Sequence, residues 1–173
     1  NSWSWSQTNI GSFTMEADIT KIQVSIWKSY KLKLSIVCCF YNAEKYFEDS
    51  LKSLFMAAPK NSEIIFVNDG STDNSSTILK DFLGLPNVVF LDNGTNKAIA
   101  YSRNRAISIA NGKYVAIHDA DDISLVHRFD LQCNYLDQNQ DVMVVGGHAI
   151  KISVTGKFLG NMVYPPENTA TGI

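Results

Sequence analysis

The 173-residue sequence lacks the marks of a membrane-spanning, secreted or zinc-finger protein. No apolar run approaches the ~18–20 residues of a membrane span, and the first residues show no charged stretch followed by the long apolar stretch of a signal peptide. The three cysteines, Cys38, Cys39 and Cys133, have no CxxC spacing, and their odd number argues against a disulfide framework. We therefore expect three buried free thiols and a reducing, cytoplasmic location.

An excess of basic charge is also missing. The formal net charge is −2 and charged residues make up 18% of the chain, so no general basic field is present to recruit nucleic acid. The apolar fraction of 45% is ordinary for a globular protein, and the length suffices for one domain with a real core.

Residues 1–31 are expected to form an extension that precedes the main domain. The start is rich in Ser and Trp and has no initiator Met, which is typical of appended or internally cut sequence. Residues 18–30 mix apolar and basic side chains in a pattern that fits a helix or a strand. This segment either covers part of the main domain, which we favour, or lies on a membrane surface as a peripheral contact.

From residue 32 onward, apolar runs alternate with amphipathic segments. Continuous apolar runs bounded by polar turns are typical of strands buried on both faces. The alternation predicts an α/β fold within residues 32–173: a mostly parallel, Rossmann-like sheet with helices on both faces and a C-terminal hairpin. The predicted strands are 34–40, 63–67, 88–91, 113–118 and 142–145; the helices begin near 43 and 75, span 98–110, and follow a capping Ser124; the hairpin is 150–159.

An acidic cluster, Asp119-Ala120-Asp121-Asp122, directly follows the apolar run 114–117. Three carboxylates in four residues repel one another, and a divalent cation is the simplest partner that makes such a cluster favourable. Oxygen ligands suit Mg²⁺ or Mn²⁺. An acidic strand-to-helix turn that binds nothing is the alternative, and it stays open at this point. We expect His118 to pack at the sheet edge rather than bind an ion, and Arg128 to pair with an acid.

Two further polar segments, Tyr41-Asn42 and 68–71, also follow predicted strands. Because parallel strands end at the same edge of a sheet, all three polar segments are expected to meet there. An aromatic ring can stack on a base, a carboxylate can accept from base or ribose donors, and a cation can neutralise a diphosphate. Glycine-rich phosphate loops of the GxxxxGK[ST] or GxGxxG type are missing, so the phosphate charge must be met by metal.

Five motifs in register carry a resemblance to a known family. They lie in the stretches 35–42, 67–73, 102–104, 112–115 and 119–122, and the similarity spans about residues 33–165. In order and spacing the chain resembles the inverting family 2 glycosyltransferases of the GT-A fold. The resemblance implies a nucleotide-sugar-binding domain that is truncated at its C-terminus, with the general base and the acceptor-binding residues beyond Ile173. No catalytic base is therefore assigned.

The resemblance also implies a role for each matching residue. Tyr41 occupies the position that packs on the base, and Asp69 the position of the carboxylate that reads the base, usually uracil. Arg103 and Asp119 occupy positions that face the nucleotide. Asp121 is the expected main ligand of Mn²⁺ or Mg²⁺, with Asp119 and Asp122 as further metal-site residues of a DxD-type motif.

The function implied is metal-dependent transfer of a sugar, with inversion, from a nucleotide diphosphate donor to an acceptor hydroxyl. A UDP-sugar donor, a hexosyl or N-acetylhexosaminyl group, and a saccharide or lipid-linked saccharide acceptor in polysaccharide biosynthesis fit the family. The alternatives are a nucleotide-sugar-binding module without turnover and a nucleotidyltransferase. The second would need a glycine-rich, basic loop where residues 41–44 stand, and a dehydrogenase would need the glycine fingerprint that is missing.

Overall fold

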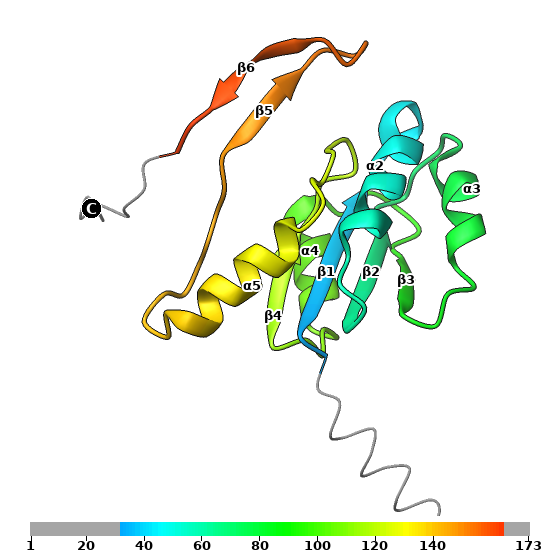
Figure 1. Ribbon diagram of the computed structural model, residues 1–173. Helices are drawn as coiled ribbons and strands as arrows, with labels where there is room; N and C mark the ends of the chain where they lie inside the picture. Colours follow the sequence, from blue (N-terminus) through cyan, green and yellow to red (C-terminus); the bar gives the residue numbers. More distant parts are fainter. Residues whose placement is uncertain (1–31, 165–173) are drawn as a thin grey trace, which may run out of the picture.

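A four-stranded parallel sheet organises residues 32–164, the part of the chain that the computed structural model describes (Figure 1). Every residue of the two central strands is buried, whereas the two outer strands are partly exposed. The predicted mostly parallel sheet is thus confirmed. The strand order is β3-β2-β1-β4, with β1 at Leu34–Phe40, β2 at Ser62–Asn68, β3 at Val88–Asp92 and β4 at Tyr114–Ile117.

Helices cover both faces of the sheet, as the alternation of apolar segments predicts. Alternate residues of β1 and β2 point to opposite faces, so each face has its own core. The helices are α2 (Glu44–Ala57), α3 (Ser75–Leu79) continued by η1 (Lys80–Phe82), α4 (Ile99–Ile107) and α5 (Arg128–Gln138). One core packs α2, α3 and α5 against Ile36, Cys38 and Phe66; the other packs α4 against Val37 and Val67.

All three cysteines are buried free thiols, as expected. Cys38 and Cys133 belong to the core under α2 and α5, and Cys39 belongs to the core under α4. Burial raises the pKa of Cys39 to about 11, so this thiol stays protonated at neutral pH.

The predicted strand at 142–145 is wrong. This segment has no ladder partner among the described residues, and Met143 and Val144 are exposed by 88% and 84%. Valine-rich sequence favours extended backbone, but a strand also needs a neighbour, and that neighbour is not encoded locally. The next residues form the predicted hairpin, β5 (Ala149–Ile152) with β6 (Phe158–Met162), which lies apart from the main sheet (Figure 1).

Two helix boundaries also differ from the prediction. Helix α4 ends at Ile107 rather than at 110, because the amides of Ile109 and Ala110 bond three residues back and tighten the chain into a turn. Helix α5 begins at Arg128, after His127 in a left-handed conformation, and has no side-chain cap. Ser124 is therefore not its cap; its hydroxyl contacts His118 and Arg128 instead.

The boundary between the extension and the main domain stays a prediction, because residues 1–31 and 165–173 lie outside the described part. Within residues 32–164, no helix has both the length and the apolar character needed to cross a membrane.

A buried carboxylate fixes the turn between α4 and β4 against the start of β1. Glu63 Oε1 accepts hydrogen bonds from Ser35 Oγ at 2.6 Å and from the Asn111 amide at 2.6 Å. The next amide, that of Gly112, donates to Ser35 Oγ at 2.8 Å. A Cβ atom on Gly112 would lie 2.4 Å from the Ser35 nitrogen, so only glycine permits this approach.

We therefore expect Gly112→Ala to lower the free energy of unfolding by about 1–3 kcal/mol, the usual cost of forcing an atom into a packed interior. Urea unfolding of both proteins at 25 °C measures the difference. Gly84→Ala is the matched control, because a Cβ there meets no atom within 4 Å. Equal destabilisation by the two substitutions would contradict the steric explanation.

Candidate functional site

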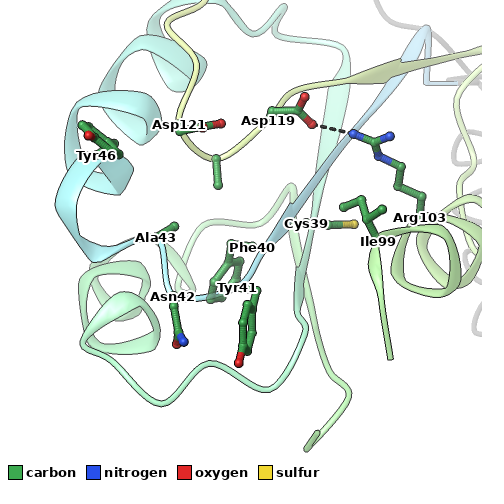
Figure 2. Close-up of a pocket in the computed structure, with 11 residues that line it drawn as sticks. Cys39, Phe40, Tyr41, Asn42, Ala43, Tyr46, Ile99, Arg103, Asp119 and Asp121 are labelled. Carbon is green, nitrogen blue, oxygen red and sulfur yellow. Dashed lines mark hydrogen bonds and ion pairs between the residues drawn. The ribbon is translucent and has the colours of Figure 1, made fainter. Parts of the chain in front are cut away.

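A cavity of about 400 Å³ opens at the carboxyl edge of the sheet, where the strand order reverses between β1 and β4 (Figure 2). The connection after β1 leads to α2 on one face, and α4, on the other face, leads into β4. Open α/β sheets bind their ligands at such a switch point. The lining residues are Cys39, Phe40, Tyr41, Asn42, Ala43, Tyr46, Ile99, Arg103, Asp119, Ala120 and Asp121.

The aromatic wall of the cavity comes from the residue that follows β1. Tyr41 is 49% exposed and its ring borders the cavity (Figure 2). Asn42 continues the wall with a positive φ of 49°, and its Oδ1 accepts from the Thr72 amide at 2.8 Å. Tyr41 thus presents an exposed aromatic ring, and the backbone that carries it is hydrogen-bonded through Asn42 to the loop at Thr72.

Crossed hydrogen bonds tie the loop before α2 to the loop before α3. Neither helix is capped by its own N-cap side chain. Instead the Glu44 amide donates to Asp73 Oδ2 at 3.0 Å, and the Asn74 amide donates to Glu44 Oε2 at 2.8 Å. Each carboxylate thereby satisfies an amide at the start of the other helix. The pair fixes the position of Tyr41 relative to the 71–75 loop.

Asp69 lies next to Tyr41 in the sheet register but does not line the cavity. The register pairs Phe40 with Asn68, so the residues that follow them are neighbours. Asp69 is buried, and its Oδ1 accepts from the Lys97 amide at 2.9 Å and from Asn93 Nδ2 at 2.7 Å. Burial raises the pKa of Asp69, but these hydrogen bonds outweigh that effect, so the net pKa lies below its usual value.

Asn93 is a structural residue that the sequence analysis missed. Its Nδ2 also donates to Ser102 Oγ at 2.8 Å, and its Oδ1 accepts from Arg105 Nη1 at 2.6 Å. It therefore joins the end of β3 to α4 and to Asp69. The sequence Asp92-Asn93-Gly94 signals a turn, and nothing local in it reveals these distant partners.

Arg103 and Asp119, both expected to face a nucleotide, form an ion pair on the cavity wall. Arg103 Nη2 lies 2.6 Å from Asp119 Oδ1, and Figure 2 shows this pair and Asp121 on the opposite side of the cavity from Tyr41. Both side chains stay partly exposed, by 35% and 51%. The structure therefore gives the cavity an aromatic side and a charged side.

The acidic cluster does not form a metal cage by itself. Among residues 32–164, no group of three or more His, Cys, Asp or Glu side chains is arranged to hold an ion. Asp119 and Asp121 line the cavity, whereas Asp122 does not. Partial burial and the charges of Asp119 and Asp121 raise the pKa of Asp122. Mg²⁺-type ions commonly take one or two carboxylates plus phosphate oxygens, so the residues present fit an ion that is shared with a phosphate ligand.

His118 packs at the sheet edge, as expected. It is 1% exposed, and both ring nitrogens contact serine hydroxyls, Ser50 Oγ at 2.8 Å and Ser124 Oγ at 2.9 Å. Burial, reinforced by the charge of Arg128, lowers the pKa of His118 to about 4, so the ring is neutral at pH 7. The expected pairing of Arg128 with an acid is wrong for the described residues: its guanidinium donates to Ser124 Oγ and to the Ile117 carbonyl.

Comparison with known proteins identifies the family. Residues 35–169 match the model of Glycosyl transferase family 2. The chain belongs to this family. It is 33% identical to the uncharacterized glycosyltransferase MJ1057 of Methanocaldococcus jannaschii over 129 residues, and this aligned region covers 73% of this chain and 44% of the relative. It is 33% identical over 116 residues to the glycosyltransferase GlyG of Streptococcus pneumoniae, with 66% and 38% covered.

Two solved structures share the fold of this chain. S. aureus TarS 1-349 in complex with UDP-GlcNAc superposes with a TM-score of 0.57 at 28% identity, over 62% of this chain and 32% of the TarS 1-349 chain. The mannosyltransferase PcManGT of Pyrobaculum calidifontis shares the fold with a TM-score of 0.53 at 18% identity, over 69% and 40% of the two chains. The GT-A fold is thus confirmed. This chain spans 36% to 44% of the length of four curated relatives.

The crossed caps generate a prediction about stability. Asp73→Ala removes acceptors for the Glu44 and Ser75 amides, and we expect it to lower the free energy of unfolding by about 1–2 kcal/mol, the usual loss for a helix cap. Glu48→Ala is the control, because Glu48 only pairs with Lys52 on the exposed face of α2 and should change stability by less than ~0.5 kcal/mol. Urea unfolding at pH 7 compares the variants.

The effect of Asp73→Ala should also depend on pH. Burial alone would raise the pKa of Asp73, but hydrogen bonds from Ser75 and the Glu44 amide lower it overall. A carboxyl with a lowered folded-state pKa adds stability above its unfolded value of ~3.9, and that stability is lost as the pH falls through the folded value. The difference between wild type and Asp73→Ala should therefore shrink below about pH 4; a constant difference down to pH 2 would contradict this.

Proposed function

We propose that this chain binds a nucleotide diphosphate sugar, with UDP as the preferred nucleotide, and takes part in transferring the sugar to an acceptor hydroxyl. The observation that carries the proposal is the switch-point cavity, which presents Tyr41 on one side and Arg103 with Asp119 and Asp121 on the other. A base stacks on an aromatic ring, and a diphosphate requires positive charge. Support also comes from TarS, which has been solved with UDP and with UDP-GlcNAc.

Each cavity residue has a distinct role in this proposal. Tyr41 packs on the base, and Arg103, whose Nη2 is paired with Asp119, donates to phosphate oxygens through its remaining N–H groups. Asp121, with Asp119 beside it, would hold Mn²⁺ or Mg²⁺ against the diphosphate. Asp122 supports this site through its charge. When bound, such a cation stabilises the negative charge that develops on the departing diphosphate.

The transfer step itself is proposed as a single displacement that inverts the anomeric centre. The acceptor hydroxyl, from a saccharide or a lipid-linked saccharide, loses its proton to a general base that we do not assign among the described residues. A second candidate function is donor binding without turnover by this chain alone, and the observation that favours it is that the chain spans 36% to 44% of its curated relatives. A sugar-transfer assay with a UDP-sugar separates the two functions.

Calorimetric titration of UDP tests the nucleotide and the cation together. We expect binding to be tighter in Mn²⁺ than in EDTA, and Asp121→Asn to weaken binding in Mn²⁺ by about tenfold or more, since a contact to a charged group contributes about 1.5–3 kcal/mol. Asp141→Asn is the matched control, because Asp141 is exposed and lies outside the cavity. Equal affinity in Mn²⁺ and EDTA would remove the metal from the proposal, and the absence of any nucleotide binding would remove the proposal itself.

The role of Asp69 can be separated from its contribution to the fold. Uracil offers an N–H donor where cytosine offers a lone pair, so a carboxylate that reads the base favours UDP over CDP. Asp69→Asn should lower the ratio of the UDP affinity to the CDP affinity by about tenfold. If Asp69 only holds the Lys97 and Asn93 contacts, the substitution will weaken both nucleotides equally. Titration of UDP and CDP into both proteins measures the ratio.

A further inference from the structure

The acidic loop, defined here as residues 119–127, is fastened to the buried side of α2. Its first residue follows His118, whose ring is 1% exposed, and Ser124 near its middle is 4% exposed. Ser50 and Ser53, both on α2, supply the fastening hydroxyls: Ser50 Oγ lies 2.8 Å from His118 Nε2, and Ser53 Oγ accepts from the Ser124 amide at 3.0 Å. The loop that carries the proposed ligands is therefore held from a core helix at two points.

Arg128 closes the arrangement from the start of α5. Its Nη1 donates to Ser124 Oγ at 3.1 Å, and its Nη2 donates to the Ile117 carbonyl at 3.0 Å. The guanidinium thus spans from the end of β4 to the middle of the acidic loop. Arginine is only a donor, so the hydroxyl proton of Ser124 cannot be accepted by Arg128 and needs another acceptor.

Counting donors and acceptors selects one tautomer of His118. If Nε2 carries the proton, it donates to Ser50 Oγ; Ser50 donates to the Asp119 carbonyl at 3.4 Å; and Ser124 donates to the bare Nδ1. Every polar atom then has a partner. If Nδ1 carries the proton, it donates to Ser124 Oγ, and the Ser124 hydroxyl proton has no acceptor among these contacts. A buried unmet donor costs free energy, so the Nε2–H form is favoured.

We infer that His118, with its ring proton on Nε2, is a positioning residue that holds the acidic loop so that Asp119 and Asp121 face the cavity. Through Ser50 it holds the backbone of Asp119, at the start of the acidic loop. Through Ser124 it holds the part of the loop that follows Asp121. It touches neither ligand nor ion. This inference rests on the proposed function in that the cavity-facing carboxylates are the proposed phosphate and cation residues.

Two substitutions of His118 each keep one of its two serine contacts and remove the other. His118→Gln retains a donor that can reach Ser50, and His118→Asn retains an acceptor that can reach Ser124. We expect both to reduce the affinity for UDP in Mn²⁺ by ~10–100-fold, the usual effect of losing a residue that orients a metal ligand, and to leave the affinity for UDP in EDTA unchanged. His148→Gln, at an exposed histidine outside the cavity, is the matched control.

Loss of stability alone must be distinguished from loss of positioning. Gly112→Ala destabilises the sheet away from the acidic loop, so it should keep the Mn²⁺-dependent gain in UDP affinity if the protein is folded. Amide hydrogen exchange adds a readout that needs no ligand: in His118→Asn, exchange should accelerate in residues 119–124 while β1 and β2 stay protected. Acceleration spread over all strands would indicate a purely structural role and overturn the inference.

The tautomer is measured directly in the wild-type protein. Long-range ¹H–¹⁵N spectra at pH 7 should show the proton of His118 on Nε2 and none on Nδ1. A ring protonated at Nδ1, or on both nitrogens, would overturn the inference. If His118→Gln and His118→Asn do not fold, Ser124→Ala and Ser50→Ala replace them in the same titrations. Wild-type protein that shows no Mn²⁺-dependent UDP binding contradicts the proposed function, and the exchange and tautomer measurements still decide the role of His118.

Discussion

Burial of β1 and β2 on both faces is the constraint on which the rest of the structure depends. All seven residues of each strand are buried, so large polar or charged side chains are restricted mainly to the strand ends. Parallel pairing then places the residues after Phe40 and Asn68 side by side. Tyr41 and Asp69 are neighbours for this reason, and the reversal of strand order between β1 and β4 leaves an opening that Tyr41 lines and Asp69 does not.

The same constraint explains how much of the fold the sequence predicts. A strand buried on both faces is a continuous apolar run, so the local sequence predicts the bounds of β1 and β2 to within one residue. Residues 142–145 have an equally apolar sequence, but a strand also needs a ladder partner, and partner choice depends on chain segments far away in sequence. The end of α4 and the start of α5 depend on turn hydrogen bonds and on the left-handed His127, which local propensity does not reveal.

The site is predicted less evenly. Four of the residues singled out from sequence, Tyr41, Arg103, Asp119 and Asp121, line one cavity, because each follows a strand or lies on the helix that packs beside it. Asp69 and Asp122 do not line it. The residues that hold the site together were not identified as such: Asn93, the Glu44–Asp73 pair, and Ser50 with His118, which are separated by 68 positions. Their partners come from distant elements, so no local pattern carries the signal.

The charges on the cavity wall bear on how a diphosphate could bind. Arg103 is the one Lys or Arg among the described lining residues, and it is already paired with Asp119 at 2.6 Å. Asp121 on the same wall, and Asp122 next to it in sequence, add negative charge. A diphosphate entering this cavity meets net repulsion unless positive charge arrives with it. This charge balance is an argument for the cation that we propose at the donor site, because Arg103 alone cannot neutralise both Asp119 and a phosphate group.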